Sequence, residues 1–229
     1  MNIAAILAGG CSKRLGGSIP KQFMPLAGKP VIEYSIQTFQ QHPFIDEIVL
    51  VVPLNYISKC EILKTKYNKI SAIIQGGEKR YLSTLAVLNK YTDNEEDTIV
   101  LHDAARPMIE KQMISNLLEA MHTYKAATLV VKTTDTIIQS KNNQIISEIF
   151  DRSTLFNVQT PQAFKLSVLR KAFQLALQDI NFQATDDSSV VFTYIPNEAI
   201  AIVESNLLNT KLTYQDDFSF LENYIQSEK

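Results

Sequence analysis

Six apolar runs of strand length recur along the chain, and segments of helical periodicity lie between several of them. The apolar runs are residues 3–8, 45–52, 71–75, 98–102, 126–132 and 199–203. Apolar positions repeat every three or four residues, as in an amphipathic helix, in residues 31–41, 80–89 and 112–122. The alternation of strands with helices is typical of a mostly parallel sheet that is covered by helices on both faces. We therefore predict an α/β protein with a Rossmann-like sheet.

Glycines and one acidic residue follow directly after three of these runs. Gly9 and Gly10 follow the first run, Gly76 and Gly77 follow the third, and Asp103 follows the fourth. Ligands of parallel sheets bind outside the carboxyl ends of the strands. We therefore expect these residues to meet at one rim of the sheet and to belong to one site.

Residues 134–152 break the alternation of strands and helices. Residues 136–139 and 144–147 have strand character and flank the polar turn 140–143, which predicts a protruding β-hairpin arm. An isolated hairpin is only marginally stable in water and needs a surface to pack against. That surface belongs either to the chain's own domain or to a second protein chain.

The composition is typical of a globular protein, with 229 residues of which 45% are hydrophobic and 20% charged. We expect one domain over residues 1–229, with the arm at 134–152. The net charge of −2 gives no overall attraction for nucleic acid. Two cysteines are too few for a disulfide framework, and the sequence contains neither a signal peptide nor an apolar stretch of membrane-spanning length. We expect a cytoplasmic protein that binds neither nucleic acid nor membranes.

The loop after the first strand has the composition of a polyphosphate-binding loop. Glycines let the backbone N–H groups approach a ligand closely, and Arg14 and Lys21 add full positive charges. The loop matches neither the Walker pattern nor the dinucleotide-binding fingerprint. The alternative interpretation is a strand-to-helix turn that is followed by a basic surface loop.

Several motifs together resemble a known family. They are residues 7–10 (Leu-Ala-Gly-Gly) with Arg14 and Gly16, 20–23 (Pro-Lys-Gln-Phe), 102–107 (His-Asp-Ala-Ala-Arg-Pro), 151–152 (Asp-Arg), 159–162 (Gln-Thr-Pro-Gln) and 209–213 (Asn-Thr-Lys-Leu-Thr). In this order they are similar to the motifs of the polyol-phosphate cytidylyltransferases, and the likeness extends from about residue 3 to residue 221. The resemblance implies that a cytidylyl group is transferred from CTP to a small polyol phosphate, with release of pyrophosphate.

Two acceptors are compatible with this resemblance. The motifs at 104–107, 150–152 and 208–211 favour 2-C-methyl-D-erythritol 4-phosphate, an intermediate of isoprenoid precursor synthesis. The motif at 7–10 favours ribitol 5-phosphate instead. A third alternative is a regulatory module that binds CTP without turning it over, although the full set of basic and acidic motif residues argues against it.

The resemblance also implies roles for individual residues. The catalytic residues, which hold the phosphates and stabilise the transition state, are Arg14, Lys21 and Lys211. The CTP-binding residues are Ala8, Gly9, Gly10, Gly76, Gly77, Ser83 and Asp103. Asp103 is also the expected ligand of a Mg²⁺ ion, because this cation prefers carboxylate oxygens together with substrate phosphates. The acceptor-binding residues are Arg106, Thr136, Arg152 and Thr160.

The family's arm exchanges with a second subunit, so the resemblance implies a homodimer in which Thr136 and Arg152 complete the neighbouring site. Two residues depart from the family pattern: Ser12 stands where the loop often has glycine, and Ile138 stands where the arm often has lysine. We expect a structural role for His102. We expect Asp186 to cap the helix that follows it.

Overall fold

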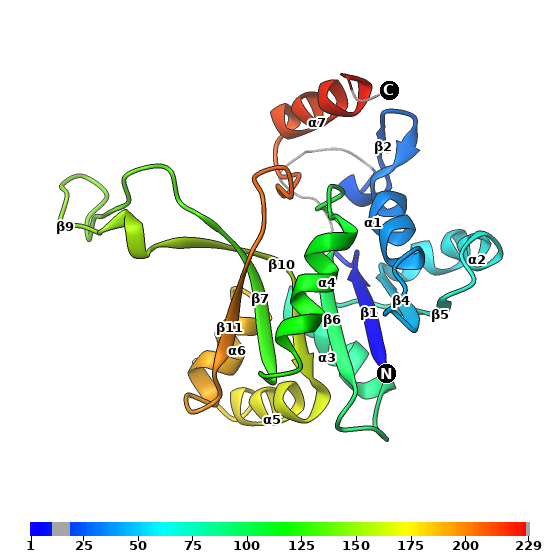
Figure 1. Ribbon diagram of the computed structural model, residues 1–229, viewed down its shortest axis with the longest axis horizontal. Helices are drawn as coiled ribbons and strands as arrows, with labels where there is room; N and C mark the ends of the chain where they lie inside the picture. The colour runs from blue at the N-terminus through cyan, green and yellow to red at the C-terminus, as the bar shows by residue number, and fades with distance from the viewer. Residues whose placement is uncertain (11–18, 228–229) are drawn as a thin grey trace.

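In the computed structural model, which describes residues 1–10 and 19–227, seven strands form a sheet in the order β11-β7-β10-β6-β1-β4-β5 (Figure 1). These strands are β1 (Asn2–Leu7), β4 (Glu47–Val52), β5 (Ile70–Gln75), β6 (Thr98–Asp103), β7 (Ala126–Lys132), β10 (Phe156–Lys165) and β11 (Ile200–Glu204). Neighbouring strands are parallel except at β10, which is antiparallel to both β6 and β7. The mostly parallel sheet is confirmed, and each of the six predicted strands is present.

Helices cover both faces of this sheet. They are α1 (Val31–Gln40), α2 (Ile57–Lys66), α3 (Arg80–Lys90), α4 (Lys111–Ala120), α5 (Leu166–Ala176) and α6 (Asp187–Tyr194). A further helix, α7 (Gln215–Ser227), lies beside the sheet. The three predicted helices correspond to α1, α3 and α4. No helix among residues 1–10 and 19–227 is long and apolar enough to cross a membrane.

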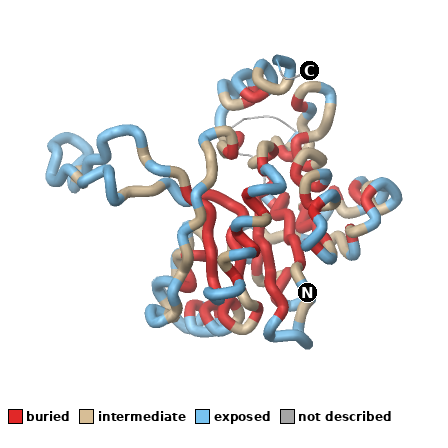
Figure 2. Tube along the Cα trace, in the orientation of Figure 1, coloured by how far each residue is buried: buried red, intermediate tan, exposed pale blue. Residues whose placement is uncertain are grey.

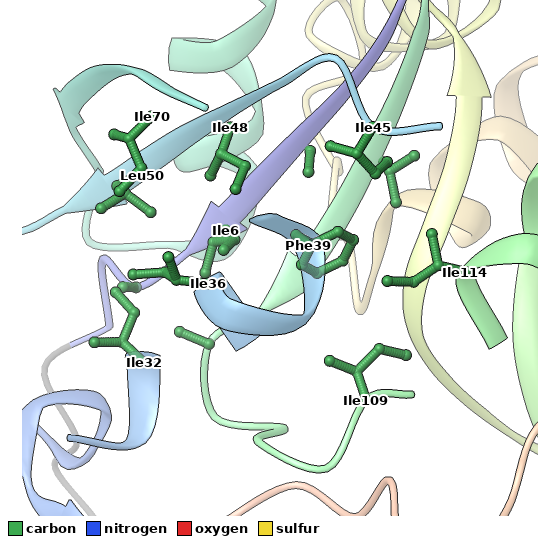
Figure 3. Close-up of a cluster of buried hydrophobic side chains, with 14 of the residues drawn as sticks. Ile6, Ile32, Ile36, Phe39, Ile45, Ile48, Leu50, Ile70, Ile109 and Ile114 are labelled. Carbon is green, nitrogen blue, oxygen red and sulfur yellow. The ribbon is translucent and has the colours of Figure 1, made fainter. Parts of the chain in front are cut away.

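The core consists of two apolar layers, one on each face of the sheet, because successive strand residues point to opposite faces. In β1, Ala4 and Ile6 pack with α1, α2 and α4, whereas Ile3 and Ala5 pack with α3, α5 and α6. Figure 3 shows the first layer, in which Phe39 of α1 lies between the sheet and α4. Because β1 is buried on both faces, its sequence is continuously apolar.

A third apolar cluster packs α7 against a short strand and the start of α1. It contains Leu26 of β2 (Pro25–Leu26), Val31, Leu212, and Phe218 and Leu221 of α7. A short partner strand, β3 (Lys29–Pro30), pairs with β2. Burial of Leu212 in this cluster holds its neighbour Lys211 at the rim of the sheet.

The predicted arm protrudes from the sheet as a long loop that contains a short hairpin (Figure 1). Its strands are β8 (Ile138–Gln139) and β9 (Glu148–Ile149), so the second strand lies later than predicted. Figure 2 shows most of the arm exposed. The chain then passes through η4 (Arg152–Thr154) into β10. Among the residues that the structure describes, the other short helices are η2 (Lys21–Phe23) and η3 (Leu54–Tyr56).

Candidate active site at the carboxyl rim

The carboxyl ends of β1, β5 and β6 meet at one rim, as the sequence predicted. In the register of the sheet, Leu7 lies beside Asp103 on one side and beside Val51 on the other. The loops continue this pattern, because the N–H of Ala104 donates to the carbonyl of Leu7 at 3.0 Å. The N–H of Gly76 donates to the carbonyl of Val52 at 2.8 Å.

Two of the predicted CTP-binding glycines lie against each other and against Ser83. A Cβ atom on Gly76 would lie 2.8 Å from Oγ of Ser83 and 3.1 Å from Cα of Gly9. A Cβ atom on Gly9 would lie 2.9 Å from the same hydroxyl. The backbone N–H of Gly77 donates to Oγ of Ser83 at 3.3 Å. A larger residue at position 9 or 76 would therefore force Ser83 or the facing backbone to move, and the first loop and the Gly76-Gly77 turn lie in close contact.

Gln22, for which no role was predicted, holds the first loop in place through its side chain. Its side-chain Nε2 donates to the carbonyls of Ala8, at 2.5 Å, and Gly10, at 2.8 Å, and the residue is buried. With these carbonyls turned towards Gln22, the loop keeps a defined path on both sides of Gly9. The motif Pro-Lys-Gln-Phe includes Gln22, but the sequence does not show which carbonyls its two amide donors contact.

The backbone carbonyl of Leu212 links Lys21 to the segment that contains Lys211. Nζ of Lys21 donates to the carbonyl of Leu212. The N–H of Leu212 in turn donates to the carbonyl of Ala105, two residues after Asp103, at 2.8 Å. Lys21 therefore lies beside the segment that carries Lys211, although the sequence separates the two lysines by almost the whole chain. Arg14 and Ser12 lie outside the described residues.

Asp103 is the electrostatic centre of the rim. Its Oδ1 accepts from Nε of Arg80 at 2.9 Å, and its Oδ2 accepts from Nζ of Lys211 at 2.6 Å. Burial alone raises the pKa of the Asp103 carboxyl, but the two cations outweigh burial and hold its pKa far below the ordinary value. Asp103 is therefore ionised at neutral pH.

His102 and Thr160 form a buried network behind Asp103. The carbonyl of Arg106 can only accept, so Nε2 of His102, 3.0 Å away, carries the proton and donates to it. Nδ1 is then an acceptor for the hydroxyl of Thr160 at 3.4 Å, and that hydroxyl accepts the N–H of Asp103 at 3.0 Å. Burial lowers the pKa of His102 to about 4, so the ring is neutral. His102 thus has the surroundings of a structural residue, as expected.

Arg106 is tied to the segment that carries Lys211. Its Nη1 donates to the carbonyl of Asn209 at 2.8 Å, and burial lowers the pKa of its guanidinium group. The side-chain Nδ2 of Asn209 donates to Oε1 of Gln159, at 2.8 Å, and to the carbonyl of Thr160, at 2.9 Å. Asn209 is fully buried and joins three of the predicted motifs, a role that its place in the Asn-Thr-Lys motif did not reveal.

Thr136 and Arg152 lie apart from the rim within one chain. Both are exposed on the arm, and Nη1 of Arg152 donates to the carbonyl of Thr134 at 3.1 Å, which is also on the arm. The arm carries five exposed isoleucines, of which Ile149 retains 63% of its accessible surface. Figure 1 shows the arm directed away from the loops around Asp103. A single chain therefore brings together the predicted residues of the rim but not these two.

Comparison with known proteins agrees with this geometry. The family model of 2-C-methyl-D-erythritol 4-phosphate cytidylyltransferase (IspD) matches residues 2–227. The chain belongs to this family. It is therefore a cytidylyltransferase, which is a class of nucleotidyltransferase.

The individual relatives include two named activities. A 2-C-methyl-D-erythritol 4-phosphate cytidylyltransferase of Thermobifida fusca is 34% identical over 231 residues, with 98% of this chain and 93% of the relative covered. A bifunctional ribulose 5-phosphate reductase/CDP-ribitol pyrophosphorylase of Haemophilus influenzae is 36% identical over 230 residues, which cover 99% of this chain and 48% of that protein. The crystal structure of 4-diphosphocytidyl-2C-methyl-D-erythritol synthase from Anaerococcus prevotii matches with a TM-score of 0.87 at 26% identity, over 99% of this chain and 98% of that one.

Asp103 is the residue of this cytidylyltransferase that fits a Mg²⁺ ion. It is an ionised carboxylate at the rim, and each of its oxygens accepts one hydrogen bond and keeps a second lone pair. Within residues 1–10 and 19–227, no group of three or more histidine, cysteine and acidic side chains is close enough to hold a metal ion. An ion at Asp103 would thus take most of its ligands from substrate phosphates and water.

Proposed function

We propose that this cytidylyltransferase transfers the cytidylyl group of CTP to 2-C-methyl-D-erythritol 4-phosphate at the rim around Asp103. The match of the family model to residues 2–227 carries this proposal. The cluster of Lys21, Lys211 and Asp103 beside a glycine loop supports it, because the reaction joins two anions and needs positive charge between them.

In this reaction an oxygen of the acceptor phosphate attacks the α-phosphorus of CTP in line with the bond to the β-phosphate. The new phosphorus–oxygen bond forms as that bond breaks, and pyrophosphate leaves with its electron pair. Both reactants are held by the protein, so alignment and charge stabilisation supply the catalysis and no covalent nucleophile is required.

We assign the nucleotide to the first loop and the Gly76-Gly77 turn. The backbone of Ala8, Gly9 and Gly10, with Arg14 and Lys21, would hold the triphosphate, and Gly76, Gly77 and Ser83 would contact the cytosine and ribose. Mg²⁺, when bound at Asp103, neutralises charge on the phosphate oxygens. Lys211 leaves Asp103 to hold the phosphate oxygens between the two substrates.

The acceptor phosphate would be held by Arg106 and by a second copy of the chain. Arg152 has the planar guanidinium fork that pairs with phosphate oxygens, and Thr136 adds a hydroxyl. Since both lie on an exposed arm with an apolar surface, we propose a homodimer in which each arm completes the partner's site. Thr160 supports the acceptor site through its contacts with Asp103 and Asn209.

We also propose a cytoplasmic location. The substrate CTP is a metabolite of the cell interior. Cys60 is buried as a free thiol, which suits a reducing compartment.

Ribitol 5-phosphate is the second candidate acceptor. The relative from Haemophilus influenzae that is named for CDP-ribitol is 36% identical, which is no lower than the identity to the relative named for 2-C-methyl-D-erythritol 4-phosphate. Both acceptors present one phosphate and several hydroxyls, so the nucleotide half of the site serves either.

The deciding experiment is an assay of pyrophosphate release from CTP and Mg²⁺, with the two acceptor phosphates in parallel reactions. We expect release with 2-C-methyl-D-erythritol 4-phosphate and little with ribitol 5-phosphate. The opposite preference would assign the protein to CDP-ribitol synthesis. CTP binding without release in either reaction would instead indicate a regulatory module.

A further inference from the structure

A row of alternating charges runs from the rim into the protein behind Asp103. Lys211 contacts Oδ2 of Asp103, Arg80 contacts Oδ1, and Nη1 of Arg80 donates on to Oδ2 of Asp187. Asp187 is the first residue of α6 and lies far from Asp103 in the sequence. One guanidinium group thus links two carboxylates, only one of which reaches the rim.

Asp187 is held firmly in this row. Its side chain is 1% exposed, and its Oδ1 accepts the hydroxyl of Thr84 at 2.8 Å. Burial raises the pKa of the Asp187 carboxyl, whereas the Arg80 guanidinium, the Thr84 hydroxyl and the N–H groups of the first turn of α6 favour its charged form. The capping box formed by Asp186 and Ser189 fixes the start of that helix. The inner end of the row therefore has little freedom to move.

The two cations on Asp103 differ in how firmly they are held. Arg80 is paired with two carboxylates through different nitrogens, and its side chain is 23% exposed. Lys211 has Asp103 as its carboxylate partner, and its side chain is 38% exposed. When an anionic ligand arrives, Lys211 is the cation that can leave Asp103 at the lower cost in desolvated charge.

We propose that Asp187 is a positioning residue for the transfer reaction and acts through Arg80. By holding Nη1, Asp187 fixes the orientation of the guanidinium group so that Nε, and not Nη2, contacts Asp103, at Oδ1. Oδ2 then stays available to Lys211 in the free protein and to Mg²⁺ when the substrates bind. This inference rests on the proposed roles of Asp103 and Lys211.

Loss of the negative charge at position 187 would change which groups contact the two carboxylate oxygens of Asp103. The guanidinium group would keep one carboxylate partner, and it can pair with both oxygens of a carboxylate at once. Arg80 would then compete with Lys211 and Mg²⁺ for Oδ2 of Asp103. The expected result is a higher Mg²⁺ requirement and slower turnover.

The test compares Asp187→Asn with Asp186→Asn. The first removes the charge that Arg80 contacts but keeps an oxygen for Thr84. The second removes the neighbouring charge, which contacts Gln162 and Ser189 instead, and asparagine still caps a helix well. We expect Asp187→Asn to lower kcat about 10- to 100-fold and to raise the Mg²⁺ concentration for half-maximal rate. We expect Asp186→Asn to stay within about twofold of the original protein, because positions outside such a network change little.

Two further measurements distinguish a positioning role of Asp187 from an effect on folding, and they do not depend on which acceptor the enzyme uses. Calorimetric titration of CTP with and without Mg²⁺, in the absence of acceptor, should show a weaker Mg²⁺-dependent gain in affinity for Asp187→Asn. Arg80→Lys, which keeps the charge but cannot span two carboxylates, should show the same loss even if Asp187→Asn fails to fold.

Wild-type kcat and Mg²⁺ dependence in both variants would overturn the proposal. Equal losses in Asp187→Asn and Asp186→Asn would also overturn it, since net charge would then be the cause. Failure of the original protein to turn over either acceptor would refute the proposed function, while the calorimetric comparison would still test Asp187.

Discussion

Single residues of the rim are linked through backbone carbonyls as much as through charges. Leu212 offers its carbonyl to Lys21 and its N–H to Ala105, and so connects the first loop to the loop after β6. The sequence indicated Lys21 and Asp103 because charged residues after apolar runs stand out. It did not indicate Gln22 or Asn209, because a buried amide is identified only by the carbonyls around it, and these come from distant segments.

Lys21→Ala tests the residue that would hold the triphosphate. We expect kcat to fall by about 100-fold or more, since removal of one charged donor from a developing anion has effects of this size. Lys21 is only partly buried and its side chain donates to a backbone carbonyl, so the free energy of unfolding should change by no more than about 1 kcal/mol. Steady-state kinetics and urea unfolding measure the two quantities.

Lys64→Ala is the matched control for Lys21→Ala, because Lys64 lies on α2 and pairs with the nearby Glu61 at the surface. This control should leave kcat unchanged. Undiminished turnover by Lys21→Ala would show that its charge takes no part in the reaction.

At the scale of elements, the strands with continuous apolar sequences were predictable and β10 was not. The Gln-Thr-Pro-Gln segment in the middle of β10 is polar, yet Gln159, Thr160 and Gln162 are buried. Gln162 alone contacts Thr128 of β7, Asp186 before α6 and the N–H of Ser188. A strand that is stabilised by side-chain hydrogen bonds has no hydrophobic period, so pattern analysis overlooks it.

The helices were predicted in part. The prediction covered α1, α3 and α4 and expected a helix after Asp186, where α6 begins, but it included neither α5 nor α7, although the apolar face of α5 repeats at helical spacing. The first turn of α6 is polar, and what its sequence did reveal was the cap: Asp186 accepts the N–H of Ser189, as expected. The function of that helix in holding Asp187 appears only when Arg80 is placed beside it.

Asp217→Ala tests how the start of α7 positions Lys211. Oδ2 of Asp217 accepts the N–H groups of Thr213, at 2.6 Å, and Tyr214, at 2.7 Å. Loss of such a cap should lower the free energy of unfolding by about 1 kcal/mol. It should also reduce kcat several-fold, because the segment from Lys211 to Tyr214 would lose its anchor. Thermal unfolding and steady-state kinetics provide the measurements.

Asp217→Asn is the control for this prediction, since its amide oxygen can still accept one or both N–H groups. It should lie between the original protein and Asp217→Ala in both stability and rate. A stable Asp217→Ala variant with full activity would mean that the apolar cluster around Leu212 holds the segment without help.

At the scale of the whole molecule, the predicted site residues form two groups, one at the rim of the sheet and one on the arm. The helices α1 to α6 pack on the seven-stranded sheet and α7 packs beside it, while Thr136 and Arg152 extend away from it on the arm. The sequence predicted the hairpin from its two apolar segments. It could not determine what covers the hairpin, because an apolar segment does not by itself identify the surface that packs against it.

Mixing two inactive variants tests whether the arm crosses to a partner. Arg152→Ala should raise the KM for the acceptor more than the KM for CTP, and Lys211→Ala should lower kcat. In a twofold-symmetric dimer with exchanged arms, a heterodimer of the two variants contains one site with both residues intact. An equal mixture that is refolded together should therefore recover about a quarter of the original activity, because half of the dimers are mixed.

If each arm served its own chain, the mixture would gain nothing over the separate variants. Arg152→Ala mixed with the original protein gives the reference for exchange, and analytical ultracentrifugation reports whether the dimers form.

The loose attachment of the arm also bears on how this family diversifies. Residues on an exposed arm contribute little to the free energy of folding, so substitutions there are tolerated more readily than substitutions in β10 or around Asp103. On our proposal that the arm binds the acceptor phosphate, a lineage could exchange one polyol phosphate for another by altering the arm, while the half of the site that we assign to CTP is inherited unchanged. This would account for the similar identities to this chain, 34% and 36%, of two relatives that are named for different products.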